Sequence, residues 1–266
     1  INVSRVLKTL DVDSTALGFS GGFPGDFIAQ TLEDSNIQSD FVQVDEDTRI
    51  NVKLKSGQET EINAPGPKVT HAQFEQLLSQ IRRTTNDDIV IVAGSVPNSI
   101  PSDAYAQIAQ ITEKTGAQLV VDAEKDLVET VLPYRPLFIK PNKDELEVMF
   151  NTTVKSDEDV IKYGKEILKK GAQSVIISLG GDGAIYVDQH QSIKAVNPQG
   201  HVVNTVGSGD STVAGMVAGV SMGLNIDEAF QQAVASGTAT AFSEDLATRD
   251  AIENIKSQVT ISVLDG

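Results

Sequence analysis

The chain has 266 residues, of which 40% are hydrophobic, so it is long enough for one large domain with a normal core and a small appendage. Its 21 Lys and Arg residues stand against 37 Asp and Glu residues, and the formal charge of −16 excludes nucleic acid as an expected partner. The absence of Cys excludes disulfides and thiolate metal sites, and no apolar run is long enough for a membrane span, so we expect a cytoplasmic protein without a membrane partner.

The N-terminal segment has the pattern of a helix. Val3, Val6, Leu7 and Leu10 recur at a spacing that places them on one helical face. No capping residue precedes Ile1, where a helix normally has one. We therefore expect that further residues precede Ile1 in the native protein.

The segment 41–63 differs in its sequence pattern from the rest of the chain. It consists of short alternating stretches, FVQVDED, TRINVKLK and ETEINA, with a turn after Ser56. A Pro-Gly-Pro sequence at 65–67 follows and is typical of a hinge. This pattern predicts a β-sheet lid over 41–63, inserted into a single domain formed by 1–40 and 64–266.

From Asp88 onward, β-branched runs alternate with helical patterns. The runs DIVIVAGS, AQLVVDA, PLFIK and QSVIISLG are separated by helical stretches such as PSDAYAQIAQITEKTG and DEDVIKYGKEILKKG. Strands separated by helices form a parallel sheet with helices on both faces. Residues 183–188 and 192–197 predict an antiparallel strand pair, and two helices are expected after Gly209. The sequence thus predicts a domain of the α/β class.

The strongest site motif is NTVGSGD at 204–210, which opens a helix rich in small residues. Because Gly207 and Gly209 lack a Cβ, several backbone N–H groups can point at one anion, which the helix dipole also attracts. A carboxylate beside an anion is unfavourable for binding alone, but Asp210 there suits a general base that accepts a proton from an attacking hydroxyl. The alternative is that Asp210 caps the helix and the glycines only permit close packing.

A second motif, KPNKDE at 140–145, is predicted at the end of a strand and the start of a helix. Asn142 and Glu145 are three residues apart and can face one pocket, where Mg²⁺ binds through a carboxylate, waters and nucleotide phosphates. The alternative is an ordinary helix N-terminus in which Glu145 compensates the dipole, and the segment taken alone favours this alternative.

A third motif, SLGGDGA at 178–184, is a strand end that enters a glycine turn. Gly180 and Gly183 would let a ligand approach the backbone closely, whereas the alternative is a turn that only joins two strands. All three motifs are predicted at the C-terminal ends of strands. An open parallel sheet binds its ligands at that edge.

The predicted lid contains two cations in the stretch TRINVK. If this stretch is a strand, Arg49, Asn51 and Lys53 point to one side, and Arg49 and Lys53 can bind a phosphate by charge-assisted hydrogen bonds. The alternative is a solvated strand face whose Lys protects an exposed edge.

These motifs resemble those of the PfkB, or ribokinase-like, carbohydrate kinases. NTVGSGD resembles the C-terminal signature of that family, PNKDE its Asn-x-x-Glu element and SLGGDG its nucleotide-side loop, and together they occur in the family's order. The resemblance implies a three-layer α/β/α fold with a mainly parallel sheet. INVSRVLKTL is similar to the continuation of the family's N-terminal signature, so we expect the glycines and the first strand of that signature before Ile1.

The resemblance also implies the role of each matched residue. Gly207, Ser208 and Gly209 would form the anion hole, and Asp210 would be the base. Mg²⁺ would be bound at Asn142 and Glu145, through water. Nucleotide-binding residues would be Lys140, Asn142, Ser178, Gly180, Gly183, Asn204 and Thr205. Similarity to the phosphosugar branch, which extends to the turn AGSVP, implies acceptor-binding residues at Asn2, Arg49, Asn51, Lys53 and Ser95.

The implied activity is phosphoryl transfer from ATP, with Mg²⁺, to a ketohexose phosphate. Fructose 1-phosphate is the favoured acceptor, giving fructose 1,6-bisphosphate, and tagatose 6-phosphate is the nearest alternative. A nucleotide-binding module of the same fold without turnover is an alternative of a different class. We also expect a homodimer in which two lids pack on each other, because a small sheet outside the core needs cover for its apolar face.

Overall fold

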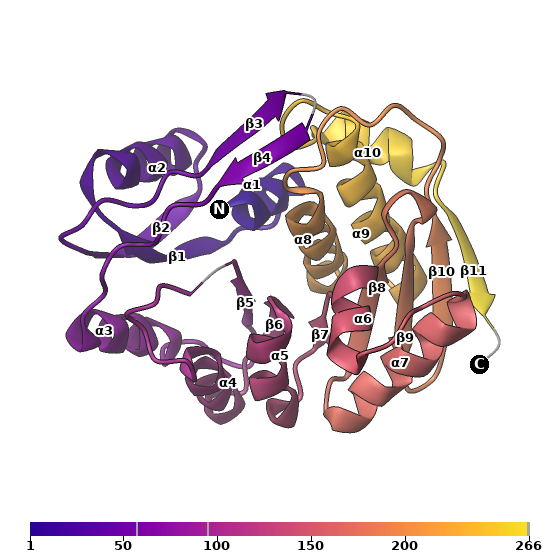
Figure 1. Ribbon diagram of the computed structural model, residues 1–266, viewed down its shortest axis with the longest axis horizontal. Coiled ribbons are helices and arrows are strands. Elements are labelled where there is room, and N and C mark those ends of the chain that lie inside the picture. Colours follow the sequence, from indigo (N-terminus) through magenta and orange to yellow (C-terminus); the bar gives the residue numbers. More distant parts are fainter. Residues whose placement is uncertain (57, 95, 265–266) are drawn as a thin grey trace.

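The computed structural model describes residues 1–56, 58–94 and 96–264 of the chain. Among these residues the main sheet has seven strands, in the order β11-β10-β9-β8-β7-β6-β5 (Figure 1). The strands are β5 (Ile89–Ala93), β6 (Gln118–Asp122), β7 (Phe138–Ile139), β8 (Ser174–Ser178), β9 (Ala184–Asp188), β10 (Ser192–Val196) and β11 (Thr260–Leu264).

The pairing of these strands follows the predicted alternation. β5, β6, β7 and β8 pair in parallel, as expected for strands joined by helices. β8, β9 and β10 pair antiparallel, which confirms the predicted strand pair. β11 adds an antiparallel edge strand that the sequence pattern did not predict.

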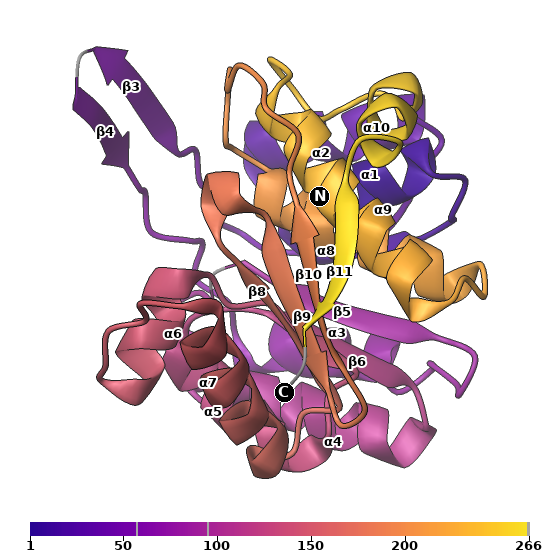
Figure 2. The same cartoon turned by 90° about the vertical axis from the view of Figure 1, so that its right-hand side faces the viewer.

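Helices cover both faces of this sheet, which confirms the predicted three layers (Figures 1 and 2). Successive residues of β6 enter different cores: Leu119 and Val121 pack in one, Val120 in the other. The first core includes α3 (His71–Ile81), α4 (Ala104–Thr115), α5 (Lys125–Val131), α6 (Lys143–Phe150) and α7 (Asp157–Lys170). The second includes α1 (Asn2–Thr9), α8 (Ser208–Ser221), α9 (Ile226–Ala241) and α10 (Arg249–Lys256). No helix among the described residues is long and apolar enough to cross a membrane.

Two smaller strand pairs complete the fold. β1 (Thr15–Ser20) and β2 (Gln38–Gln43) pair in parallel and are connected by α2 (Gly22–Asp34). β3 (Val52–Ser56) and β4 (Gln58–Ile62) form an antiparallel hairpin that projects from the body in Figure 2. The hairpin lies inside the predicted lid.

The start of the predicted lid needs correction. β2 begins at Gln38 and runs across the expected boundary at residue 41, and its partner is β1 of the main body. The buried side chains of Val42 and Val44 anchor this stretch in the main core. The sequence pattern could not reveal this, because alternation alone does not identify the partner of a strand.

Candidate active site

The turn before α8 has the geometry of an anion site. Gly207 is the N-cap residue with φ +82°, a conformation that favours glycine, and no side chain caps the helix. The N–H groups of Gly209 and Asp210 lie in the first turn, where an α-helix offers no backbone acceptor. Asn204 shapes the approach, since its Oδ1 accepts from the N–H of Val206 at 3.2 Å and its Nδ2 donates to Glu244 at 3.0 Å.

Asp210 lies in the first turn of this helix and contacts the opposite end of the chain. The Nδ2 of Asn2 donates to Oδ2 of Asp210 at 2.9 Å. Asn2 begins α1, which packs on α8 through Val6 and Leu7. The hydrogen bond fixes the rotation of the carboxylate and leaves Oδ1 available for a substrate proton.

Lys140 lies next to the same turn. Its Nζ is 3.2 Å from the point that a Cβ on Gly209 would occupy, so glycine at 209 makes room for the ammonium group. The Lys140 side chain is only 7% exposed and pairs with Asp122, Nζ to Oδ1, at 3.3 Å. A buried ammonium group needs such a partner, because desolvation penalises an unpaired charge.

Asp122 is a site residue that the motif analysis missed. It ends β6, and its neighbour in the sheet, β7, leads directly into Lys140. Burial raises the pKa of the Asp122 carboxyl; Lys140 opposes that rise, while the charges of Asp210 and Glu145 add to it. The sequence contained one indication of this role, because Asp122 lies near the end of a predicted strand and the C-terminal ends of parallel strands bind ligands.

The Asn142 and Glu145 side chains form a capping box at the start of α6. Oδ1 of Asn142 accepts from the N–H of Glu145, and Oε2 of Glu145 accepts from the N–H of Asn142, both at 2.8 Å. The structural alternative considered for this motif is therefore present. One carboxylate oxygen of Glu145 remains outside the box and can bind a metal ion directly or through water.

The glycine turn between β8 and β9 is open to ligands on one side. Ser178 ends β8, and Gly180 and Gly183 both have positive φ, +61° and +93°. A Cβ on Gly180 or Gly181 would meet nothing within 4 Å, whereas one on Gly183 would collide with the carbonyl of Ala195. Gly183 is thus required for packing, and Gly180 leaves free space above the backbone.

The predicted acceptor-binding residues are only partly described. Arg49 and Asn51 are exposed and precede β3, which begins at Val52, and their alignment with Lys53 stays a prediction. The backbone next to Arg49 is nevertheless held in place by two hydrogen bonds. The N–H of Thr48 donates to the carbonyl of Gly21 at 2.8 Å, and the N–H of Gly21 donates to Oγ1 of Thr48 at 3.0 Å. The Lys53 side chain and Ser95 lie outside the described residues.

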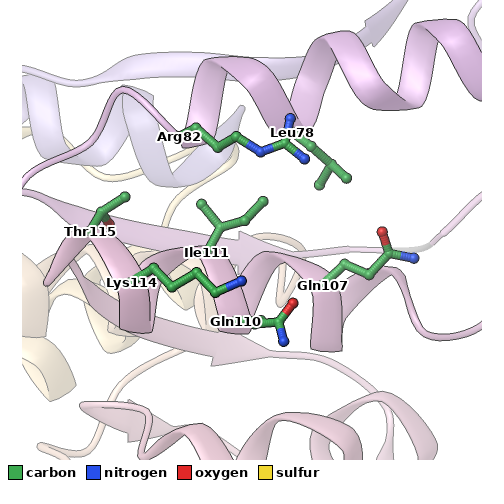
Figure 3. A pocket seen from close by; sticks show the side chains of 7 residues that line it. All are labelled: Leu78, Arg82, Gln107, Gln110, Ile111, Lys114 and Thr115. Atoms are coloured by element: carbon green, nitrogen blue, oxygen red, sulfur yellow. The ribbon is translucent and has the colours of Figure 1, made fainter.

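A separate cavity of about 220 Å³ opens between α3 and α4 (Figure 3). Buried Leu78 and Ile111 lie among its walls, with Arg82 and Lys114 beside them. None of the residues predicted for the site lines this cavity. The candidate site lies instead where the end of β7 meets the start of α8, at Lys140 and Gly209.

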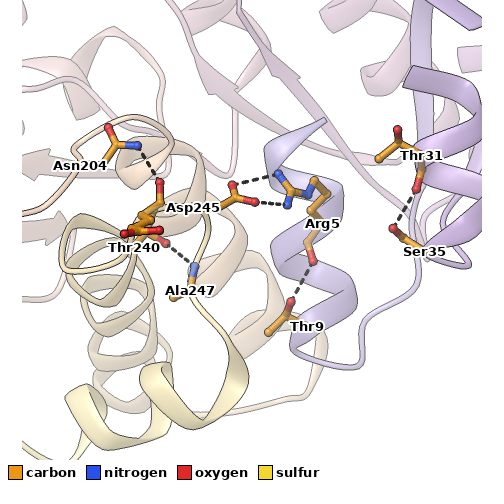
Figure 4. A network of polar contacts seen from close by, with 9 residues as sticks. Arg5, Thr9, Thr31, Ser35, Asn204, Thr240, Asp245 and Ala247 are labelled. Atoms are coloured by element: carbon orange, nitrogen blue, oxygen red, sulfur yellow. Dashed lines mark hydrogen bonds and ion pairs between the residues drawn. The ribbon is translucent and has the colours of Figure 1, made fainter. Parts of the chain in front are cut away.

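An ion pair connects α1 to the loop after α9. Arg5 donates to both carboxylate oxygens of Asp245, at 3.2 Å and 2.7 Å (Figure 4). The hydrogen bond from Arg5 lowers the pKa of the Asp245 carboxyl below its ordinary value. Because the carboxyl has a lower pKa in the folded state than its pKa of about 4 in the unfolded state, its ionised form stabilises the fold above about pH 4. This stabilisation is lost as the pH falls through the pKa of the folded state.

Replacing Arg5 with Ala is therefore expected to lower the unfolding free energy by roughly 0.5–1 kcal/mol at pH 7, because the pair is largely exposed. The difference between variant and wild type should shrink below about pH 4. Thermal unfolding at pH 7 and pH 3 measures both effects. Lys8→Ala, which removes the other ion pair of α1, to Asp13, is the control. An equal loss at both pH values would contradict the assignment.

Comparison of the sequence and of the structure with known proteins identifies the family of this chain. Residues 1–251 match the family described as pfkB family carbohydrate kinase. The chain is 43% identical over 264 residues to 1-phosphofructokinase of Bacillus subtilis (strain 168), covering 99% of this chain and 87% of the relative. It is 37% identical over 265 residues to D-tagatose-1-phosphate kinase of Bacillus licheniformis, with the same coverage.

Solved structures agree with these matches. A Staphylococcus aureus protein provisionally named a phosphofructokinase is 81% identical, with a TM-score of 0.92 and coverage of 100% of this chain and 87% of that chain. Phosphofructokinase-2 from Escherichia coli in complex with substrates and products is 28% identical, with a TM-score of 0.92 and coverage of 97% and 86%.

Proposed function

The chain belongs to the pfkB family of carbohydrate kinases, and from this premise we propose that it transfers a phosphoryl group from ATP to a ketohexose phosphate. It is a phosphotransferase with an alcohol acceptor, as are its kinase relatives. The observation on which the proposal rests is the uncapped glycine turn of α8, with Asp210 hydrogen-bonded to Asn2 and Lys140 beside Gly209.

In the proposed reaction the sugar hydroxyl oxygen attacks the γ-phosphorus of ATP, and the bond from that phosphorus to the bridging oxygen of ADP breaks. Asp210 accepts the hydroxyl proton on its free oxygen. The N–H groups of Gly209 and Asp210 and the ammonium group of Lys140 stabilise the negative charge on the transferred group. No covalent intermediate with the protein is required.

The residues at the site fit a magnesium ion. The carboxylate oxygen of Glu145 that takes no part in the capping box is available as a ligand beside the start of α6. Mg²⁺ favours such oxygen ligands together with phosphates and water, and it would neutralise phosphate charge when bound. We assign its protein contact to Glu145, with Asn142 beside it. Among the described residues no group of three or more His, Asp or Glu could hold a metal ion, so the nucleotide phosphates and water would have to supply the remaining ligands.

Fructose 1-phosphate is the acceptor that we favour, since two relatives at 43% and 38% identity are named 1-phosphofructokinase. Tagatose phosphates are the alternative, supported by the tagatose kinases at 37% and 32% identity. We assign binding of the acceptor phosphate to Arg49, with Asn51, Lys53 and Ser95 as further contacts. The use of ATP favours the cytoplasm as the working compartment.

The test is ATP consumption with fructose 1-phosphate, tagatose 1-phosphate, tagatose 6-phosphate and fructose 6-phosphate in parallel. We expect the highest kcat/KM with fructose 1-phosphate. Arg49→Ala should raise the acceptor KM about 10- to 100-fold, the value of a hydrogen bond to a charged group. Arg82→Ala, at an exposed arginine outside the site, should leave it unchanged. ATP binding without turnover on any acceptor would favour the non-catalytic alternative.

We further propose a homodimer that forms through the β3–β4 hairpin. Val52 and Ile62 are cross-strand partners, and they are 43% and 56% exposed. A two-stranded hairpin with uncovered apolar side chains is barely stable alone, so a second copy would bury them. One similar protein, phosphofructokinase-2 from Escherichia coli, has a tetrameric inhibited form.

Sedimentation is expected to give a dimer for wild type and a monomer for Ile62→Asp, because a buried unpaired charge opposes association. Val263→Asp is the matched control, since Val263 is 62% exposed on the edge strand β11. The control should remain dimeric. A monomeric wild-type protein would refute the proposed interface.

A further inference from the structure

The glycine turn Gly180–Gly183 is a short 3₁₀ turn closed by its own backbone. Its hydrogen bonds run from the N–H of Leu179 to Gly183 at 2.8 Å, from Asp182 to Leu179 at 3.3 Å and from Gly183 to Gly180 at 3.2 Å. Gly180 and Gly181 have empty space above their Cα atoms. A turn built in this way needs an external contact if its conformation is to be fixed before a ligand binds.

Asn197, which follows β10, provides that contact. Its Nδ2 donates to the carbonyl of Gly180 at 3.0 Å and lies 3.4 Å from the carbonyl of Gly181. Its Oδ1 lies 2.8 Å from the hydroxyl of Thr238, on α9, which shares its one proton between this oxygen and the carbonyl of Val234, also at 2.8 Å. Asn is suited to this position because its short side chain presents a donor to the turn and an acceptor to the helix at once.

The Thr238 end of this link is rigid. Thr238 is 6% exposed, and its neighbour Gly237 packs so closely on α8 that an added Cβ would lie 3.0 Å from the carbonyl of Ser208. The hydroxyls of Ser211 and Thr240 join the same two helices at 2.9 Å. Asn197 therefore connects the glycine turn to α9. Because α9 packs on α8, the link extends to the helix that begins with the anion turn.

We propose that Asn197 and Thr238 are positioning residues that preform the glycine turn for ATP. This inference rests on the proposed function, in which the turn binds the nucleotide. Neither side chain needs to touch the reacting atoms. A preformed turn loses less conformational freedom when ATP binds, so the link should act on ATP affinity and little on the chemical step.

The experiment measures MgATP affinity by calorimetry together with steady-state kinetics. Thr238→Val, which removes the hydroxyl at nearly constant size, should raise the Kd and KM for ATP about five- to tenfold, as expected for the loss of one net hydrogen bond. Asn197→Asp, which replaces the donor by a carboxylate oxygen facing two carbonyls, should raise them at least as much. Both variants should retain kcat within about threefold and the acceptor KM of wild type.

Two further variants separate positioning from general loss of structure. Thr238→Ser retains the hydroxyl and should restore wild-type ATP affinity. Adding Thr238→Val to Asn197→Ala should cost nothing more than Asn197→Ala alone, since the two residues act through one link. Circular dichroism and the unfolding temperature verify that each variant is folded. Should Asn197→Ala fail to fold, the comparison of Thr238→Val with Thr238→Ser still decides the question.

The outcomes distinguish this inference from the proposed function. Unchanged ATP affinity in Asn197→Asp and Thr238→Val, or a fall in kcat without a change in KM, would overturn the positioning role alone. Wild-type protein that binds MgATP without turnover would overturn the proposed function, and the calorimetric comparison would still test the link. Wild-type protein that does not bind MgATP would overturn both.

Discussion

Replacing Asp210 with Asn is expected to lower kcat by about 10²–10⁴-fold, the usual contribution of a general base. Asn has nearly the same shape but cannot accept the hydroxyl proton, so the loss should appear in kcat. This corresponds to roughly 2.7–5.4 kcal/mol of the activation barrier. The KM for ATP should change little, because the N–H groups of the anion turn remain. Steady-state rates with fructose 1-phosphate measure the effect.

Asp250→Asn is the matched control for this experiment. Asp250 is also an acidic residue in the first turn of a helix, α10, but it is exposed and outside the site. Its kcat should equal that of wild type. Substantial turnover by Asp210→Asn, within about tenfold of wild type, would show that Asp210 is not the general base.

Lys140→Met is expected to have the second-largest effect, a fall in kcat of about 10²-fold or more, because a buried cation beside the transferred phosphoryl group is lost. Asp122→Asn should lower kcat by about tenfold or more, since Asp122 fixes the ammonium group at 3.3 Å. If Asp122 acts through Lys140, adding Asp122→Asn to Lys140→Met should change kcat by less than about threefold.

The double variant also reports on the cost of burying a single charge. Asp122→Asn leaves the buried ammonium group of Lys140 without its partner and should lower the unfolding free energy by about 3–5 kcal/mol. Lys140→Met leaves only the half-buried Asp122 and should cost less, and the double substitution should recover part of the larger loss. Thermal unfolding of the four proteins completes the cycle. Multiplicative losses of kcat in the double variant would mean that Asp122 contributes independently of Lys140, and would refute its assignment as the residue that positions the lysine.

Much of the fold was predictable because its signals are local. The alternation of β-branched and helical runs predicted the strands from β5 to β10 and the helices α4, α6 and α7, all of which lie in the described structure, but not the short helix α5 between β6 and β7. The edge strand β11 was not predicted, since a short exposed strand at the end of a chain has no distinctive pattern. Residues 38–43 belong to the main body because they form β2, which pairs with β1. The sequence pattern of either strand does not identify the other as its partner.

The candidate site divides in the same way. Glycines at the start of a helix predicted the anion turn, because the conformation at Gly207 and the free N–H groups depend on a few consecutive residues. The Asn142–Glu145 capping box is equally local. The alignment of Arg49 with Lys53 stays a prediction, because Arg49 precedes β3, which begins at Val52, and the Lys53 side chain lies outside the described residues.

The α/β class, the family resemblance and the position of the two glycine turns could be read from residues near one another in the chain. The hydrogen bond from Asn2 to Asp210, 208 residues away, and the pairing of Asp122 with Lys140 became visible only when the chain was folded. The same is true of the place of Asn197 between the glycine turn and α9. Such contacts depend on how helices and strands pack, and the periodicity of a single segment contains no information about which distant side chain it will meet.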